Sequence, residues 1–345
     1  MDNYKCLKDF SLSELEALME EIGEKKFRAK QIYEWLHVKL CESYEDMTNI
    51  PKALKEKLAK DYTVSAAKIS ITQVSKRGDT KKYLMVLNDN NTLESVWMKH
   101  KHGNSVCVSS QVGCRMGCRF CASTANGLVR SLSVAEMLEQ VYNITRETGE
   151  RVDNIIIMGM GEPLDNYDNV INFIRRITEK GGLNISERSI TLSTCGLVEN
   201  IRRLAEEGLS ITLAISLHAP DDEKRKLIMP IANKYSIKEI FEATDYYIEK
   251  TKRRVSVEYT LIKGDNDTKE CAMKLTRLLK GKLYHVNLIP LNQVEGRYGK
   301  RSIRENIEDF KILLEKNRIN VTIRREMGGD IDAACGQLRN NKMNQ

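Results

Sequence analysis

Apolar residues in the first part of the chain recur at helical spacing. Ser11 is placed to cap a helix that continues through Leu12 to Met19 with apolar residues three and four positions apart. The segment 27–40 repeats this spacing, and Pro51 is expected at the first position of a third helix. We therefore predict a small helical module over residues 1–66.

The pattern then changes to alternation of apolar and polar positions. It extends from residue 67 to residue 101 and is interrupted by turn residues at 78–79 and 88–91. This pattern predicts a short antiparallel meander, assigned here to residues 67–104, that leads into the core of the protein.

From residue 105 onward, strand-like segments alternate with helix-like segments. Alternation of this kind predicts an α/β fold with a parallel sheet and outer helices, and about six units predict an incomplete (β/α)6 barrel over residues 105–325. Helices are expected at 134–147 and 237–250, among others. The predicted strands are 105–112, 153–158, 188–194, 209–216, 255–262, 283–290 and, more weakly patterned, 319–325.

The unusual motifs of the chain follow these predicted strands. In barrels of this type the chemistry lies at the C-terminal ends of the strands, so the motifs are expected to meet there. The last of them opens a C-terminal segment, 326–345, that we predict to be a catalytic loop. The motif segments are 114–121, 158–163, 193–196, 216–220, 290–292 and 325–336.

Composition and charge indicate which partners and which cellular compartment to expect for the protein. The chain has 345 residues, with 55 Lys and Arg against 48 Asp and Glu, a formal net charge of +7 and nine cysteines. The charge is compatible with a polyanionic partner, although each basic cluster taken alone could be solvated surface. We find neither a signal peptide nor an apolar run of about 18 residues, and the odd cysteine count suits a reducing compartment, so we expect no membrane association and a cytoplasmic location.

Three cysteines within eight residues form the strongest chemical signal. Cys114, Cys118 and Cys121 are spaced C-x3-C-x2-C, and such soft thiolates bind zinc or an iron–sulfur cluster. No fourth ligand is spaced to close a zinc site, since His102 and Cys107 lie upstream. Three ligands on a four-iron cluster leave one iron open for a small molecule. A partial zinc site and three unrelated thiols remain alternatives.

Other motif residues are candidates for ligand binding. Glu162 could accept a hydrogen bond from an amino group, and the glycines before it let a ligand approach the backbone closely; a plain turn is the alternative. Composition alone would make Cys107 and Cys335 small buried residues. Ser193, Ser216, His218 and Asn292 have short polar side chains suited to ribose, carboxylate or adenine, although a lone histidine such as His218 is more often structural.

The cysteine spacing resembles that of the radical S-adenosylmethionine (SAM) superfamily, whose [4Fe-4S] cluster binds SAM at the open iron. Residues 106–337 resemble the RlmN family of dual-specificity RNA methyltransferases through CVSSQVGCRMGCRFCAS, GMGEPL, LSTCG, SLHAP, HVNLIPLN and REMGGDIDAACGQL. The helical N-terminus is similar to that family's RNA-binding accessory domain. The resemblance implies methylation of C2 of an adenosine in 23S rRNA and in tRNA.

The resemblance also implies a mechanism that uses two SAM molecules per turnover. The first methylates Cys335, and the second is cleaved on the cluster to a radical that activates the Cys335 methyl group for addition to C2. Glu94 then accepts the C2 proton, and Cys107 attacks Cys335, which releases RNA and leaves a Cys107–Cys335 disulfide. An external electron donor such as flavodoxin and a monomeric state are expected. The implied SAM contacts are Gly161, Glu162, Ser193, Ser216, Leu217, His218 and Asn292.

Two alternatives stay open. A sister group, the Cfr type, methylates C8 of the same ribosomal adenosine; it carries alanine in place of Pro163, so Pro163 and the segment 290–292 favour the C2 reaction. The second alternative, from a different class, is a non-catalytic metal-bound RNA-binding protein, against which the Gly-Glu-Pro motif and the Cys335 segment argue.

Overall fold

The N-terminal part of the protein is a helical module with its own apolar core. The computed structural model describes residues 5–338. Its first elements are β1 (Lys5–Cys6), η1 (Leu7–Asp9), α1 (Leu12–Glu21), α2 (Phe27–His37), α3 (Lys52–Leu58) and β2 (Tyr62–Thr63), and β1 pairs with β2 in parallel. The three helices pack their apolar faces on one another around Leu15, Ile32 and Leu54. As predicted, Ser11 caps α1, in a capping box with Glu14. Pro51 is the N-cap of α3 and precedes the first helical position.

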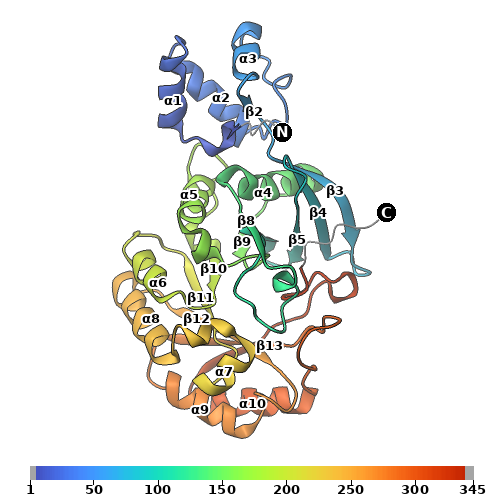
Figure 1. The fold of residues 1–345 in the computed structure, drawn as a ribbon, viewed down its shortest axis with the longest axis vertical. Coiled ribbons are helices and arrows are strands. Elements are labelled where there is room, and N and C mark those ends of the chain that lie inside the picture. Colours follow the sequence, from blue (N-terminus) through green and yellow to red (C-terminus); the bar gives the residue numbers. More distant parts are fainter. Residues whose placement is uncertain (1–4, 339–345) are drawn as a thin grey trace.

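A ten-stranded sheet forms the centre of the protein (Figure 1). The meander β3 (Ala67–Val74), β4 (Thr80–Leu87) and β5 (Thr92–His100) is antiparallel, as predicted, and joins the sheet through β6 (Gly103–Cys107). From β6 onward neighbouring strands are parallel, and the sheet ends at β14 and β3 without closing. The parallel strands after β6 are β9 (Asn154–Ile157), β10 (Ile190–Thr194), β11 (Thr212–Ser216), β12 (Val255–Leu261), β13 (Tyr284–Pro290) and β14 (Asn320–Ile323).

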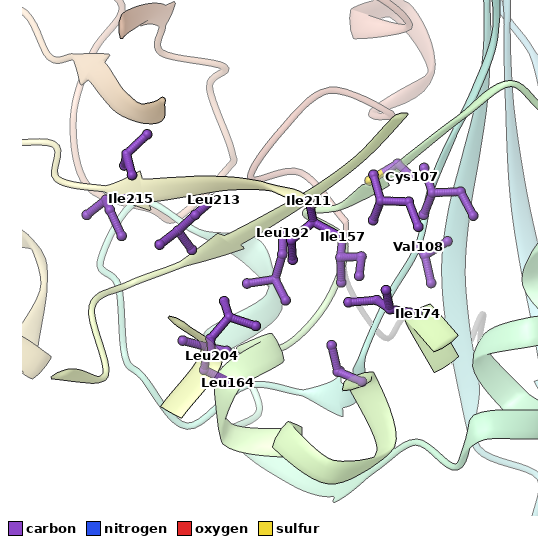
Figure 2. Close-up of a cluster of buried hydrophobic side chains, with 14 of the residues drawn as sticks. Cys107, Val108, Ile157, Leu164, Ile174, Leu192, Leu204, Ile211, Leu213 and Ile215 are labelled. Carbon is purple, nitrogen blue, oxygen red and sulfur yellow. The ribbon is translucent and has the colours of Figure 1, made fainter. Parts of the chain in front are cut away.

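Helices connect the parallel strands and bury the apolar side chains that the strands present. Figure 2 shows this packing, with Ile157, Leu192 and Leu213 of successive strands near Ile174 and Leu204 of two helices. Burial of each such side chain contributes about 1.5–3 kcal/mol. The predicted helices at 134–147 and 237–250 end within one residue of the observed ones. The helices are α4 (Val134–Thr148), α5 (Tyr167–Thr178), α6 (Val198–Ala205), α7 (Asp222–Ile228), α8 (Ile237–Thr251), α9 (Lys269–Leu279) and α10 (Arg304–Lys316).

The predicted strand 105–112 is wrong as a continuous element. Strand β6 ends at Cys107, and β7 (Gln111–Gly113) pairs with β8 (Leu128–Ser131) in a separate two-stranded sheet. The break occurs because Ser109 forms hydrogen bonds outside the ladder: its N–H donates to Oε1 of Gln140 on α4 at 2.8 Å, and its hydroxyl donates to the Glu94 carbonyl at 2.7 Å. The three-cysteine segment therefore leaves the main sheet through this hairpin.

Buried polar contacts attach the helical module to the central sheet. The Lys8 ammonium group is fully buried, pairs with the Glu139 carboxylate of α4 and donates to the Cys41 carbonyl at 2.9 Å. Asp9 accepts from the N–H of Ala135 in the first turn of α4 at 2.8 Å. The module is thereby held against α4 by a fully buried ion pair and by the half-buried Asp9 carboxylate.

The described part of the chain, residues 5–338, contains no helix that is both long and apolar enough to cross a membrane.

Candidate active site

A cavity opens at the C-terminal ends of the parallel strands, with about 950 Å³ of empty volume. Its wall includes Cys114, Cys118 and Cys121, together with residues that follow β9, β10, β11 and β13. The structure therefore brings together motifs that are up to about 220 positions apart in the sequence, at the edge where the alternating pattern predicted that they would meet.

Two of the three thiols, those of Cys114 and Cys118, lie in an apolar environment. Cys114 and Cys118 pack with Met116, Phe120 and Met229, and burial raises the pKa of the Cys114 thiol to about 12 and raises that of Cys118 further. Among residues 5–338, no three His, Cys, Asp or Glu side chains converge on one metal-ion position. The three soft donors are instead distributed around a single volume, and this arrangement fits a multi-iron cluster.

Glu162 is buried at the cavity wall and organises the neighbouring loop. One carboxylate oxygen accepts the N–H of Cys195 at 2.8 Å, and the other accepts the N–H of Leu164 at 3.1 Å. Burial raises the pKa of this carboxyl despite these bonds. Since each carboxylate oxygen has two lone pairs, Glu162 retains the capacity to accept a bond from a ligand's amino group.

The glycines before Glu162 are required by the packing of the chain on itself. A Cβ atom on Gly159 would lie 2.6 Å from Oγ of Ser109, and one on Gly161 would lie 2.6 Å from Cβ of Gln111. Gly161 also has a φ of 101° and lines the cavity. We expected these glycines to let a ligand approach the backbone closely. In the structure, the segment 109–111 of the chain itself lies against them.

Ser193, Ser216 and His218 line the same cavity. The two serine hydroxyls lie 3.2 Å apart at the ends of neighbouring strands. His218 Nδ1 accepts the N–H of Thr260 at 3.0 Å, and burial lowers the pKa of the imidazole to about 3. His218 is therefore neutral, with its proton on Nε2, and its ring also packs edge-on against Phe120 with the centroids 5.0 Å apart.

Leu217 is the one predicted SAM contact that lies outside the wall of this cavity. Its N–H donates to the Glu258 carbonyl at 3.1 Å, and its carbonyl accepts from Arg225 Nε at 3.2 Å. Both of its backbone polar groups are engaged behind the wall, so Leu217 supports the loop that carries Ser216 and His218.

A second cavity, with about 940 Å³ of empty volume, adjoins the first. Cys107 lines the second cavity only, whereas Cys335 and Asn292 line both. Asn292 Nδ2 donates to the Cys335 carbonyl at 3.0 Å, which fixes the C-terminal segment at the junction. Both cysteines are free thiols. The structure thus places Cys335 between the cavity of the three cysteines and the cavity of Cys107.

Glu94 lies on the strand beside Cys107 but is not part of either cavity wall. Its carboxylate is 3.3 Å from the Lys82 ammonium group. Since side chains alternate along a strand, Glu94 shares a face of β5 with Val96 and Met98, which line the second cavity. Glu94 therefore lies on the same face of the sheet as residues that line the second cavity.

Arg324 is a site residue that the sequence analysis did not assign. It lines both cavities, and its Nη1 is 3.7 Å from the buried Glu258 carboxylate. The electrostatic influence of Cys335, Glu258 and Cys107 raises the pKa of its guanidinium. Its place near the end of the last predicted strand, 319–325, was the available signal, because the ends of the parallel strands lie at the C-terminal edge of the sheet.

Comparison with known proteins assigns both parts of the chain to described families. Residues 108–275 match the Radical SAM superfamily, and residues 6–64 match the ribosomal RNA large subunit methyltransferase N-terminal domain. A probable dual-specificity RNA methyltransferase RlmN of Lachnoclostridium phytofermentans is 61% identical over 333 residues, which cover 96% of this chain and 94% of the relative. One of Clostridium perfringens is 53% identical over 335 residues, covering 97% and 96%.

A solved structure shares the fold over almost the whole chain. The crystal structure of a radical SAM methyltransferase from Sphaerobacter thermophilus superimposes with a TM-score of 0.95 at 41% sequence identity, and the match covers 98% of this chain and 100% of that one. The mixed α/β fold with its N-terminal module is therefore that of a radical SAM methyltransferase.

Proposed function

Because this chain belongs to the RlmN family of dual-specificity RNA methyltransferases in the radical SAM superfamily, we propose that it methylates C2 of an adenosine in 23S rRNA and in tRNA through a methyl group carried on Cys335. The observation that carries this proposal is the position of Cys335 at the junction of two cavities. A carrier must reach the methyl donor on one side and the acceptor on the other.

The first cavity is the proposed site of the cluster and SAM. Cys114, Cys118 and Cys121 would hold the [4Fe-4S] cluster, and Glu162 would accept a hydrogen bond from the amino group of SAM. When bound, the cluster supplies the electron that cleaves SAM and yields the hydrogen-abstracting radical. Gly161, Ser193, Ser216, His218 and Asn292 also line this volume and are the proposed SAM contacts.

The second cavity is the proposed site of the target adenosine, which must be unstacked to reach it. Cys335 contributes the methylene carbon there, and its initial methylation requires the thiolate. Arg324 lines both cavities together with Cys335. Glu94 accepts the C2 proton, and the unpaired electron that the addition leaves on the adduct would return to the cluster. Cys107 then attacks the Cys335 sulfur. The bond from that sulfur to the methylene carbon breaks, and the carbon keeps the electron pair and takes up a proton to become the methyl group. RNA leaves, and the two cysteines form the disulfide that an external reductant resets.

The remaining parts of the proposal follow from the family. Residues 1–66 are proposed as the RNA-binding accessory domain, 67–104 as the meander extension, 105–325 as the incomplete (β/α)6 barrel and 326–345 as the catalytic loop; residues 1–4 and 339–345 of these segments lie outside the described part of the chain. We further propose a cytoplasmic monomer that receives electrons from a donor such as flavodoxin.

Product analysis tests this proposal directly. Protein purified without oxygen is incubated with SAM, dithionite and an unmodified 23S rRNA fragment, and the digested nucleosides are identified by mass spectrometry. We expect 2-methyladenosine from the wild type and from the control variant Cys271→Ala, whose thiol is buried on α9 away from both cavities. Cys335→Ala should give none at an unchanged iron content.

Two results would contradict the proposal. Recovery of 8-methyladenosine would assign the chain to the C8 reaction of the sister group. Zinc in place of iron, with no methylated product, would favour the metal-bound RNA-binding protein.

A further inference from the structure

Arg225 on α7 is fully buried and is bound only to backbone carbonyl groups. Its Nε donates to the Leu217 carbonyl at 3.2 Å, and its Nη2 donates to the carbonyls of Cys195 at 2.6 Å and Ser216 at 3.4 Å. Its side chain is 0% exposed, and Nη1 is buried without a hydrogen-bond partner. Within residues 5–338, Arg225 forms no ion pair.

A buried cation without an anion is strongly unfavourable. The burial of Arg225 without an anionic partner therefore indicates that a negative charge is missing nearby. Asp222 is three residues earlier on the same helix, but its carboxylate accepts the N–H of Ile237 at 2.7 Å. On the cavity side, Arg225 donates to the carbonyl of Cys195, and Cys195 and Cys118 both line the first cavity.

The three carbonyl contacts also fix where the charge lies. They belong to the segments after β10 and β11, so the guanidinium bridges two loops of the cavity wall from behind. A planar guanidinium held by such a set of acceptors has little freedom to turn away. The positive charge therefore stays directly behind Cys195 and Ser216 of the cavity wall, even though Arg225 itself does not line the cavity.

We propose that Arg225 is the buried counter-cation of the iron–sulfur cluster and sets its reduction potential from behind the cavity wall. The inference rests on the proposed function to the extent that the first cavity holds a cluster. One-electron reduction adds a negative charge to an assembly that is already anionic because of its three thiolates. A fixed positive charge stabilises the reduced form more than the oxidised form. Without it the cluster becomes harder to reduce.

A redox titration of the anaerobic protein, monitored by the electron paramagnetic resonance signal of the reduced cluster, tests this role. The variants are Arg225→Gln, which removes the charge, Arg225→Lys, which keeps it, and Lys226→Gln, which removes the same charge from an exposed neighbour on α7. Iron and sulfide are counted in each preparation before titration.

At a fixed potential near the wild-type midpoint, we expect at least a tenfold lower ratio of reduced to oxidised cluster in Arg225→Gln. For a one-electron couple this corresponds to a midpoint about 59 mV more negative. Arg225→Lys and Lys226→Gln should stay within about threefold of the wild-type ratio, a pattern that a merely structural role would not produce.

A wild-type ratio in Arg225→Gln at full iron content would overturn the inference. If that variant assembles no cluster, Arg225→Lys decides: a near-wild-type ratio supports a requirement for charge, and a tenfold loss despite the retained charge overturns it. Failure of the proposed function has a different signature, because the wild type itself would then carry no reducible iron–sulfur cluster.

Discussion

Cys107 is a thiol whose environment opposes the role proposed for it. Burial raises its pKa to about 12, although the nearby Arg324 acts in the opposite direction. Attack on the Cys335 sulfur requires the thiolate. At neutral pH only a small fraction of Cys107 is ionised, and this fraction grows tenfold with each pH unit until the pKa is reached.

We therefore predict that release of RNA from its covalent adduct with Cys335 accelerates about tenfold per pH unit between pH 7 and pH 9. The measurement is the decay of the RNA–protein adduct on denaturing gels after acid quenching at a series of pH values. Cys107→Ala should accumulate the adduct at every pH. A rise that flattens between pH 8 and pH 9 would show that the attacking thiol has an ordinary pKa.

The contrast between two residues shows what the sequence could reveal about the site. Cys114, Cys118 and Cys121 lie within eight residues of one another, and their spacing alone indicated soft-metal chemistry. Arg225 lies in the run Lys224-Arg225-Lys226, which reads as a solvated basic surface. Only the tertiary fold shows that the middle residue of this run is buried behind the cavity, because α7 packs that face against the ends of β10 and β11.

At the scale of elements, runs of apolar residues bounded by turn residues predicted the parallel strands to within a few residues. The error at 105–112 has a non-local cause. Val106, Val108 and Val112 continue the apolar pattern, but Gln140, on a helix about 30 positions later, takes the N–H of Ser109 away from the ladder. A local pattern cannot reveal a partner that distant.

Helix α4 connects the helical module to the sheet, and its contact with Lys8 makes the connection testable. Glu139 is 0% exposed, and besides Lys8 it pairs with Arg146 at 3.0 Å. We predict that Lys8→Met lowers the free energy of unfolding by about 3 kcal/mol, the low end for breaking a buried pair, because Arg146 still partners Glu139. Urea unfolding provides the measurement.

The same substitution should also loosen the module from the sheet. Hydrogen exchange in α1 and α2, and proteolysis in the segment 59–66, should accelerate in Lys8→Met more than in the sheet strands. The control is Lys26→Met, which removes an exposed lysine 3.0 Å from Glu20 and should leave both measurements unchanged. Equal behaviour of the two variants would contradict a structural role for the buried pair.

At the scale of the whole molecule, the positive charge is unevenly distributed. Residues 1–66 hold 11 Lys and Arg against 13 Asp and Glu, so the net charge of +7 comes from the rest of the chain. Several basic residues there are already neutralised by carboxylates, as in Lys81 with Glu147 and Lys99 with Glu150. The RNA binding that we propose for the helical module would therefore depend on local groups and not on the charge of the module as a whole.

Three lysines form a local basic group in the module: Lys52 and Lys55 on helix α3, and Lys60 just after it. If these lysines contact phosphates, changing all three to Gln should weaken RNA binding and reduce the slope of log K against log salt by up to about 0.7–0.9 per lost contact, because fewer counterions are released. The rate of methylation at saturating RNA should not change, since both cavities lie outside this helix.

The matched control removes three charges elsewhere, at Lys238, Lys269 and Lys280 on or next to α8 and α9, which lie at the opposite end of the molecule from α3 (Figure 1). Both triple variants lower the net charge equally, so a long-range field effect would weaken RNA binding to the same extent in the two. A loss confined to the α3 variant, with a reduced salt slope and a normal rate at saturation, would assign the phosphate contacts to the module. Equal losses would mean that the module positions RNA by shape or stacking, while attraction comes from the field of the whole protein.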